Sequence, residues 1–378
     1  MNDHLKLPPA SEVRKIACLM INGIGDTVCV TPAVAALREN YPDAELTMIV
    51  RPPINDLIVG IPAIDRIIHY ETKKGLVRRL SFFWHVYRER FDLWVDLHVP
   101  TYNTTYSNDH NFLRNSILMR AASARFRLGY DVPQLSPHLT HRVPVPTNSE
   151  LQHVNIITTT LAIVSPPPGK QFQKQISIGE NDRKWVEDQL PPSGRTRIAL
   201  FFGSEQPADL WPMEHALDFI RAVSERLPEL ELVLIGSSFE RELSEQIERL
   251  RPNLGDAALH NFIERATLSQ TGALLESCDA MVATDSGPMH MGDAVGLPTV
   301  TLFSSKNYIG IWQPISRPTE LLNRHVPCAP CLSGDCDRNN ECMRLISPED
   351  AYGALVSLLN RIERKVRPEF VLVSTAGS

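Results

Sequence analysis

Short apolar runs alternate with helical patterns along most of the chain. In the first half, apolar segments at 13–21, 45–50, 66–69 and 92–97 predict buried strands, and residues 33–40 and 73–90 predict helices. A second series predicts strands at 197–202, 231–235, 279–284 and 299–303, with helices at 212–227, 240–250 and 264–277. Strands that alternate with helices in both halves predict an α/β protein with two doubly wound parallel sheets facing a cleft.

A proline-rich stretch separates the two series. Ser-Pro-Pro-Pro-Gly at 165–169 ends a helix predicted over 150–164 and is typical of the approach to a linker. We therefore expect an N-terminal domain over residues 1–175 and a C-terminal domain over 176–378. A last helix is predicted at 351–364.

A candidate phosphate site follows the strand predicted at 279–284. The chain there reads Asp285-Ser286-Gly287-Pro288-Met289-His290, in which Ser286 is a good N-cap and Pro288 suits a first helical turn. Free N–H groups at a helix start favour a bound phosphate. The residues alone leave a second interpretation open, in which Asp285 and Ser286 only cap an ordinary helix.

A glycine turn follows the first predicted strand and reads Asn22-Gly23-Ile24-Gly25-Asp26. Thr31-Pro32 predicts that the next helix starts at Thr31, which would leave Asp26 in the loop beyond the strand, where open α/β sheets bind ligands. The alternative role of Asp26 is turn formation. Val28 stands near where the dinucleotide fingerprint needs its third glycine, which excludes an NAD or FAD site.

Composition narrows the class of protein. A chain of 378 residues with 43% hydrophobic and 22% charged residues is typical of a globular protein with two domains. Its net charge of −6 argues against a nucleic-acid partner. No apolar run approaches the ~20 residues that span a bilayer, and residues 1–10 lack a signal pattern, so we expect a cytoplasmic protein.

Positive charge gathers in one segment of the first half. Residues 66–127 contain eleven Lys or Arg and five Asp or Glu, a net charge of +6 in a chain of net charge −6. One interpretation is a solvated helix face. The other is a surface for an anionic acceptor or for the anionic inner membrane leaflet, where the protein would bind peripherally.

The seven cysteines fall into two groups. Cys18, Cys29 and Cys278 lie in apolar segments and are predicted to be buried thiols. The others form the pattern Cys328-x2-Cys331-x4-Cys336-x5-Cys342. Four thiols at this spacing could hold a structural zinc or iron ion, since four thiolates leave no open position for catalysis. Unligated thiols in a loop are the alternative.

Several of these motifs together resemble one enzyme family. The run from Asp285 to His290, followed by a small-residue helix and Gly-x-Pro at 296–298, resembles the nucleotide-sugar motif of glycosyltransferase family 9, the ADP-heptose:lipopolysaccharide heptosyltransferases. The glycine turn with Thr31-Pro32, the segments 91–97 and 128–130, and Trp211-Pro212 are similar to further family segments in the same order.

The resemblance implies a GT-B fold, with two Rossmann-like domains about a central cleft. It implies an acceptor-binding N-terminal domain, a nucleotide-sugar-binding C-terminal domain, and a final helix at 351–364 that packs back on the N-terminal domain. The implied reaction is inverting transfer of a heptose from an ADP-linked sugar to an anionic lipopolysaccharide-core acceptor. No cofactor or metal is implied for catalysis.

The resemblance also assigns roles to residues. Asp26 would be the general base that deprotonates the acceptor hydroxyl. The donor-binding positions would be Gly23, Gly25, Gly203, Ser204, Glu240, Asp285, Ser286, Gly287 and His290.

The chain departs from the family pattern at two places. Asp209 stands where members usually carry a lysine that meets the diphosphate, so another cation such as Lys306 or Arg183 must replace it, or the donor or activity differs. His98 begins a segment that lacks the usual Gln-Gly, which leaves the acceptor open. A nucleotide-sugar epimerase of similar architecture and a binding protein with weakened catalysis are the alternative functions.

Overall fold

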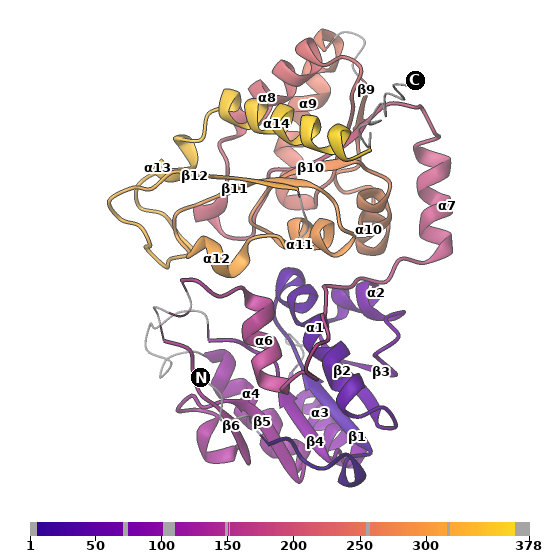
Figure 1. Cartoon of the computed structure of the whole chain (residues 1–378), viewed down its shortest axis with the longest axis vertical. Helices are drawn as coiled ribbons and strands as arrows, with labels where there is room; N and C mark the ends of the chain where they lie inside the picture. Colours follow the sequence, from indigo (N-terminus) through magenta and orange to yellow (C-terminus); the bar gives the residue numbers. More distant parts are fainter. Residues whose placement is uncertain are drawn as a thin grey trace, which may run out of the picture.

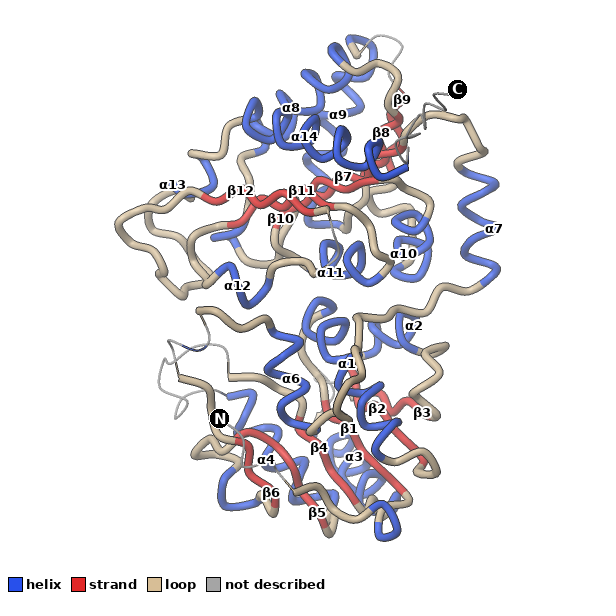
Figure 2. Tube along the Cα trace, in the orientation of Figure 1, coloured by secondary structure: helices blue, strands red, loops and turns tan. Residues whose placement is uncertain are grey.

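The computed structural model describes residues 6–70, 75–100, 110–147, 150, 152–254, 258–315 and 318–366. These residues form two parallel six-stranded sheets, and helices cover both faces of each (Figure 1). The two units are stacked along the long axis of the molecule, and the linker runs up one side to α7 (Figure 2). The predicted α/β class with two doubly wound domains is therefore confirmed.

The N-terminal sheet has the strand order β3-β2-β1-β4-β5-β6, and all its pairs are parallel. Its inner strands are apolar almost throughout because helices bury both of its faces. The strands are β1 (Lys15–Leu19), β2 (Glu45–Val50), β3 (Arg66–His69), β4 (Leu93–Asp96), β5 (Phe126–Tyr130) and β6 (His141–Val143). The helices are α1 (Ile24–Asn40), α2 (Asn55–Ile58), α3 (Leu76–Glu89), α4 (His110–Ala122) and α6 (Ile156–Val164), with 3-10 turns at Ala10–Glu12, Pro52–Ile54 and Ser136–His138.

The C-terminal sheet has the order β12-β11-β10-β7-β8-β9 and is again parallel. Its strands are β7 (Arg197–Phe201), β8 (Glu231–Leu234), β9 (Ala258–Asn261), β10 (Ala280–Thr284), β11 (Thr299–Phe303) and β12 (Thr319–Asn323). The helices are α7 (Glu180–Gln189), α8 (Met213–Arg226), α9 (Arg241–Leu250), α10 (Leu268–Glu276), α11 (Gly287–Ala294), α12 (Ile309–Trp312), α13 (Glu341–Arg344) and α14 (Pro348–Val366). Short 3-10 turns lie at Pro207–Asp209, Ser238–Glu240 and Arg251–Asn253.

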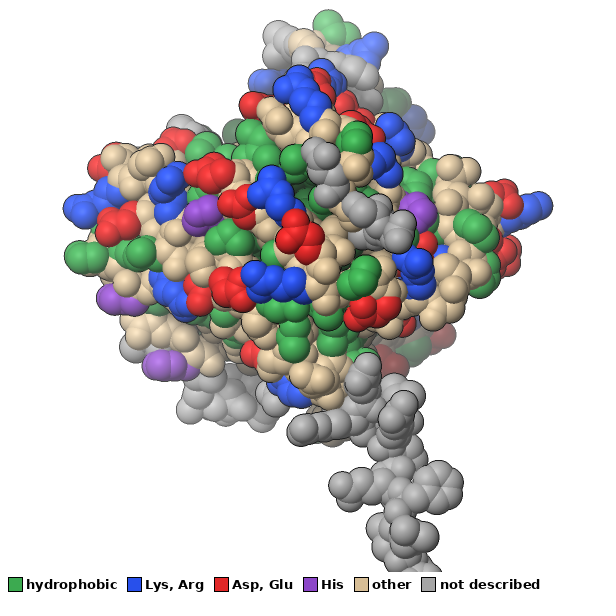
Figure 3. All heavy atoms as spheres, turned by 90° about the horizontal axis from the view of Figure 1, so that it is seen from above, with side chains coloured by type: hydrophobic (Ala, Val, Ile, Leu, Met, Phe, Trp, Pro, Cys, Tyr) green, Lys and Arg blue, Asp and Glu red, His purple; other side chains and the backbone are tan. Residues whose placement is uncertain are grey.

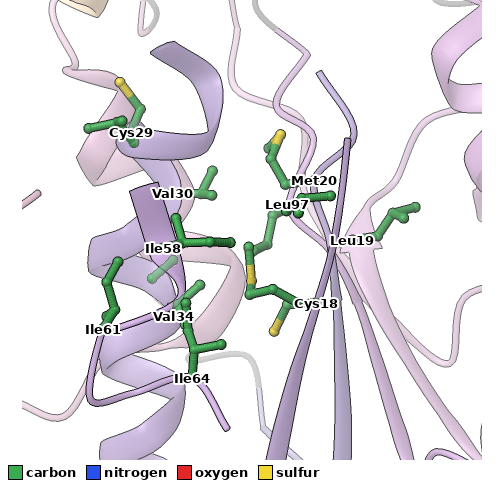
Figure 4. Close-up of a cluster of buried hydrophobic side chains, with 14 of the residues drawn as sticks. Cys18, Leu19, Met20, Cys29, Val30, Val34, Ile58, Ile61, Ile64 and Leu97 are labelled. Carbon is green, nitrogen blue, oxygen red and sulfur yellow. The ribbon is translucent and has the colours of Figure 1, made fainter. Parts of the chain in front are cut away.

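Apolar side chains between sheet and helices hold each unit together. In the N-terminal unit, side chains from β1, from α1 and from residues 58–64 converge on one cluster (Figure 4). Cys18 and Cys29 belong to this cluster, and Cys278 is also buried, as the sequence predicts. Burial raises the pKa of both Cys29 and Cys278 to about 12, so these thiols stay uncharged.

Helix α1 begins earlier than the sequence predicts. It starts at Ile24 rather than Thr31 and carries Pro32 in its interior. A proline there cannot donate to the carbonyl of Val28, but the hydroxyl of Thr31 donates to that carbonyl at 2.7 Å and satisfies it. Asp26 therefore lies in the first turn of α1 and not in a free loop, and its Oδ2 accepts the N–H of Gly23 at 3.2 Å.

Two other helices differ from expectation. The helix predicted at 150–164 begins at Ile156, because Asn155 caps it by accepting the N–H of Ile157 at 3.0 Å. The final helix, α14, does not pack back on the N-terminal domain, and that expectation is wrong. It lies across α8 and strands β10–β12, with Leu355 and Leu358 fully buried in the C-terminal core (Figure 1).

Candidate active site

The carboxyl ends of the two sheets face each other, and the first turns of α1 and α11 meet there. A Cβ placed on Gly25 would lie 2.8 Å from Cδ2 of His290, and one on Gly287 would lie 3.0 Å from Cβ of Ile24. Only glycine allows two helix starts to approach this closely. The structure thus brings together Gly23, Gly25 and Asp26 of one predicted motif with Gly287 and His290 of the other.

The hydroxyl of Ser286 does not cap α11. Ser286 is the N-cap residue in extended conformation, but its Oγ donates to the carbonyl of Thr284 at 3.1 Å and accepts no N–H from the first turn. Ser286 therefore occupies the N-cap position without capping the helix through its side chain. The N–H groups of the first turn of a helix lack partners within the helix and suit an anion, and the start of α11 lies against the start of α1.

A buried lysine from the linker supports this helix. Nζ of Lys174 lies 2.7 Å from Oδ2 of Asp293 and 3.0 Å from Nδ1 of His290, and the Lys174 and Asp293 side chains are 1% and 0% exposed. An ammonium group can only donate, so Nδ1 of His290 accepts and Nε2 carries the ring proton. The sequence analysis missed Lys174, because nothing near it in the chain indicates the contact with α11.

Burial and nearby charges set the protonation of the site. Burial, reinforced by Lys174, lowers the pKa of His290 well below its ordinary value, so the ring is neutral. Burial and the neighbouring Asp209 raise the pKa of Asp285 to about 8, although Lys306 and Lys174 oppose that rise. Oδ1 of Asp285 lies 4.0 Å from Nε2 of His290. The motif thus offers a neutral ring N–H donor beside a carboxyl that is readily protonated.

Gly203 and Glu240 lie side by side beyond the carboxyl ends of β7 and β8. A Cβ on Gly203 would overlap Oε1 of Glu240, so the glycine makes room for that carboxylate. Glu240 is 6% exposed and accepts the N–H and the hydroxyl of Ser237 at 2.6 and 3.0 Å. Burial raises its pKa. The carbonyl of Gly203 accepts the hydroxyl of Thr284 at 2.6 Å, which ties this turn to the Asp285 motif.

Ser204 follows Gly203 and shapes the loop beyond β7. Its Oγ accepts the N–H of Gln206 at 3.0 Å. The next residue, Glu205, is close enough to Asp26 of the N-terminal domain for its negative charge to add to the rise in pKa that burial causes in that carboxyl group.

Asp209 is paired rather than uncompensated. Nζ of Lys306 donates to Oδ2 of Asp209 and to Oε1 of Gln206, and the hydroxyl of Ser304 donates to the other Asp209 oxygen. Lys306 is 4% exposed and close enough to Asp285 to oppose the rise of its pKa. The other candidate cation, Arg183, lies in α7 and bonds Glu276 at 2.7 and 3.0 Å. Of the two, Lys306 is the cation at the site.

The cysteine segment, residues 328–342, is hydrogen-bonded to the backbone on both sides of this ion pair. The N–H of Leu332 donates to the carbonyl of Lys306 at 3.0 Å, and the N–H of Ala208 donates to the carbonyl of Gly334 at 3.0 Å. Nδ2 of Asn340 donates to the carbonyl of Pro207 at 2.7 Å. The cysteine segment is therefore hydrogen-bonded to both loops that carry the ion pair, the loop of Asp209 and the loop of Lys306.

The thiols of that segment are gathered only in part. Burial and then the neighbouring Cys336 and Cys328 raise the pKa of Cys342, whose Sγ accepts the N–H of Ser305 at 3.4 Å, whereas Cys331 is exposed. Within the described ranges, no three Cys, His, Asp or Glu side chains converge closely enough to hold a metal ion.

On the N-terminal side, Asp26 lies in the cleft beside His98. Burial raises the pKa of Asp26, while His98 and the Gly23 N–H oppose the rise. The backbone N–H of His98 donates to Oδ1 of Asp96 at 2.9 Å, and its Nδ1 lies 2.6 Å from Nδ2 of Asn22. His98 lies just beyond β4, which pairs with β1 in the sheet. The strand order alone could therefore have indicated that His98 lies close to the glycine turn that follows β1.

Comparisons with known proteins identify the family of the chain. The model of glycosyltransferase family 9 (heptosyltransferase) matches residues 91–341. Lipopolysaccharide heptosyltransferase 3 of Escherichia coli is 22% identical over 306 residues, which cover 77% of this chain and 84% of that protein.

Two solved structures are similar in fold. E. coli ADP-heptose lps heptosyltransferase II has a TM-score of 0.72 and 19% identity, over 92% of this chain and 99% of that one. The iron-containing dodecameric glycosyltransferase TibC of enterotoxigenic E. coli has a TM-score of 0.54 and 13% identity, over 94% and 77%. The fold is thus the GT-B fold of such enzymes. Because the family match spans well over half of its length, the chain belongs to glycosyltransferase family 9, the heptosyltransferases.

Proposed function

We propose that this glycosyltransferase moves a heptose from an ADP-linked sugar to a lipopolysaccharide-core or related anionic glycolipid, with inversion at the anomeric carbon. The contact between the first turns of α1 and α11 carries the proposal, because it sets the carboxylate of Asp26 and the anion site of α11 on either side of one cleft. The names of the E. coli relatives, lipopolysaccharide heptosyltransferase 3 and ADP-heptose lps heptosyltransferase II, support the sugar, the donor and the acceptor.

The donor diphosphate would lie against the start of α11. Its oxygens would accept the first N–H groups of α11, Nε2–H of His290 and the ammonium of Lys306. The Glu240 carboxylate, beside Gly203, would accept hydroxyl groups of the donor's nucleoside. Because negative charge grows on ADP as it leaves, these donors bind the transition state more tightly than the substrate.

Asp26 would act as the general base. It removes the proton of the acceptor hydroxyl as that oxygen attacks the anomeric carbon, and the bond from this carbon to the phosphate oxygen breaks with its electron pair leaving on ADP. Attack opposite the leaving group inverts the anomeric centre. Asn22 and Asp96 hold His98 beside the carboxylate, where its ring opposes the rise in the pKa of Asp26.

In this proposal the acceptor carries negative charge and lies at a membrane. The basic segment at 66–127 supports an anionic acceptor and peripheral contact with the cytoplasmic leaflet of the inner membrane. No described helix is both long enough and apolar enough to cross a bilayer.

The first prediction concerns the base. Asp26→Asn should lower turnover by ~10²–10⁴-fold, the range for loss of a general base, while ADP affinity stays within about twofold of wild type. Since burial raises the pKa of Asp26, wild-type kcat/KM should fall as pH drops through that raised pKa, and the variant should lack this limb. The exposed Asp43→Asn is the control.

Turnover of Asp26→Asn close to wild type would refute the role of Asp26. Conversion of the donor alone into an isomer, with no acceptor present, would favour an epimerase instead. Donor binding by the wild type without either reaction would favour a binding protein.

The second prediction tests the glycine contact. Gly25→Val and Gly287→Val should each weaken ADP binding by roughly tenfold or more, because the added side chains meet His290 or Ile24 and overpacking costs about 1–3 kcal/mol. Gly353→Val in α14 is the control, because a Cβ there has no neighbour within 4 Å. Calorimetry on variants that remain folded at the assay temperature decides the matter, and unchanged affinity in both would place the donor elsewhere.

The third prediction tests the replacement cation. Lys306→Met should weaken ADP binding by about 10–100-fold, more at low salt, because a hydrogen bond to a charged group is worth ~1.5–3 kcal/mol. Arg183→Met should leave affinity unchanged, since Arg183 already bonds Glu276.

Lys306→Met alone leaves Asp209 buried without its cation and will lower stability. The double variant Lys306→Met/Asp209→Leu removes both charges and should fold, yet still bind ADP weakly. Wild-type affinity in this folded double variant would mean that Lys306 does not face the diphosphate.

The fourth prediction concerns the cysteine segment. We propose that Cys328, Cys331, Cys336 and Cys342 hold one structural iron or zinc ion, supported by their spacing and by the iron-containing neighbour. Elemental analysis of protein purified without a metal-affinity step should find about one ion per chain, and Cys331→Ser should lower that content. Four titratable thiols in folded, metal-poor protein would contradict the site.

A further inference from the structure

Helix α3 exposes an apolar stripe to water. Val77, Leu80, Trp84 and Tyr87 are 81%, 57%, 60% and 57% exposed. Their spacing of three, four and three residues sets them along one side of the helix. A single exposed apolar residue needs no explanation, but a stripe of four at helical spacing does.

The stripe is not the face that attaches α3 to the sheet. Val86 is fully buried on the other side of the helix, and Phe82 and Phe83 pack against the same core, with Phe82 edge-to-face against Tyr70 at 5.1 Å. This second apolar face is sufficient to attach an amphipathic helix to its own domain. The exposed stripe therefore serves something outside the fold.

The neighbouring helix extends this surface. Helix α4 packs against α3 and exposes Leu113 and Ile117, four residues apart, at 53% and 49%. We call the six exposed apolar residues of the two helices the α3–α4 patch.

Basic side chains surround the α3–α4 patch. Arg79, Arg88 and Arg120 are exposed beside it, and the guanidinium of Arg88 lies 4.5 Å over the Trp84 ring. Glu89, the last residue of α3, accepts hydrogen bonds from Arg66 at 2.8 and 3.1 Å, which neutralises its charge. By contrast, basic and acidic side chains are interspersed over the opposite end of the molecule (Figure 3).

A basic pocket adjoins the patch. It has a volume of about 500 Å³ and lies between the edge strand β3 and α3. Trp84 lines it together with five basic side chains, which are Arg66, His69, Arg78, Arg79 and His85. An apolar surface beside a basic pocket of this size suits a ligand that has both a hydrocarbon part and an anionic head.

We propose that the α3–α4 patch and its pocket dock the protein on a bilayer of anionic phospholipid, with Trp84 and Tyr87 at the interface and the arginines on the headgroups. Aromatic rings favour that depth, and each Lys or Arg near an anionic surface contributes attraction. A second copy of the chain would bring two arginine clusters together and is the weaker occupant. The inference rests on the proposed function in that the acceptor is taken to be a lipid in the same membrane.

The placement of the patch fits such an acceptor. Helices α3 and α4 each follow a strand of the parallel sheet, so both begin at its carboxyl edge, the edge that carries Asp26 and His98. A bilayer against these helices would therefore lie beside the acceptor half of the cleft.

Vesicle flotation of the full chain, with no donor or acceptor sugar added, tests the docking. Wild type should bind vesicles of phosphatidylglycerol and phosphatidylcholine mixed in equal parts, and should not bind phosphatidylcholine alone. Leu80→Ser/Trp84→Ser/Tyr87→Ser should bind at least tenfold more weakly. Arg79→Glu/Arg88→Glu should also bind weakly and should lose most of the salt dependence.

Matched controls come from the rest of the surface. Val59→Ser/Leu345→Ser removes side chains that are 61% and 51% exposed, and Arg221→Glu reverses an exposed charge on α8. These variants should bind vesicles like wild type. All variants should keep the wild-type melting temperature and the wild-type affinity for ADP.

Two outcomes overturn the docking surface. One is vesicle binding by the wild type that is equal with and without anionic lipid, or vesicle binding by the patch variants that equals that of the wild type. The other is a wild-type dimer in solution that the triple serine variant converts to monomer, which would make the α3–α4 patch a contact between copies. Failure of the transferase assay with intact, patch-dependent vesicle binding would count against the proposed function alone.

Discussion

The ion pair between Lys174 and Asp293 fixes the linker between the two domains against helix α11. Lys174 lies in the linker, Asp293 lies in α11, and both side chains are almost fully buried. Removing one partner of such a pair typically costs ~3–5 kcal/mol, because the other charge is left without compensation in the interior. The next residue, Gln175, donates its N–H to the hydroxyl of Thr31 in α1 at 2.9 Å. Two consecutive linker residues thus connect α1 with α11.

This constraint also sets the chemistry of the cleft. Because Lys174 occupies Nδ1 of His290, the ring presents Nε2–H, and Nε2 is directed toward the region of Asp285. The donors of the site are therefore oriented by contacts within the chain and its histidine is neutral, and preorganised donors of this kind need no rearrangement as charge develops. The low local dielectric that makes Lys174 costly to bury also strengthens its effect on the neighbouring groups.

Local sequence was sufficient for most of the inner strands and for the two glycine motifs. Strand β2 has the predicted bounds, because a mainly apolar run marks a strand that is buried on both faces. Strands β5, β6, β9 and β12 were missed, since each mixes polar with apolar residues and lacks that signal. The start of α1 was misplaced because Pro32 is normally a boundary and the compensating hydroxyl of Thr31 cannot be inferred from a pattern. Lys174 was missed because its partners lie more than a hundred residues away.

Asp209 shows why a single position cannot be judged by its own charge. Taken alone, a carboxylate beside a diphosphate is repulsive. In the folded chain, Lys306 from the loop after β11 donates a hydrogen bond to Asp209. Gln206 and Ser304 complete the hydrogen bonds of the pair. The buried carboxylate then orients a cation instead of opposing an anion. The cysteine segment bonds the backbone on both sides of the pair, at Ala208 and at Lys306, so the position of that cation depends on how the segment is folded. Asp209, Lys306 and the cysteine segment therefore form one structural unit, and the role of each depends on the other two.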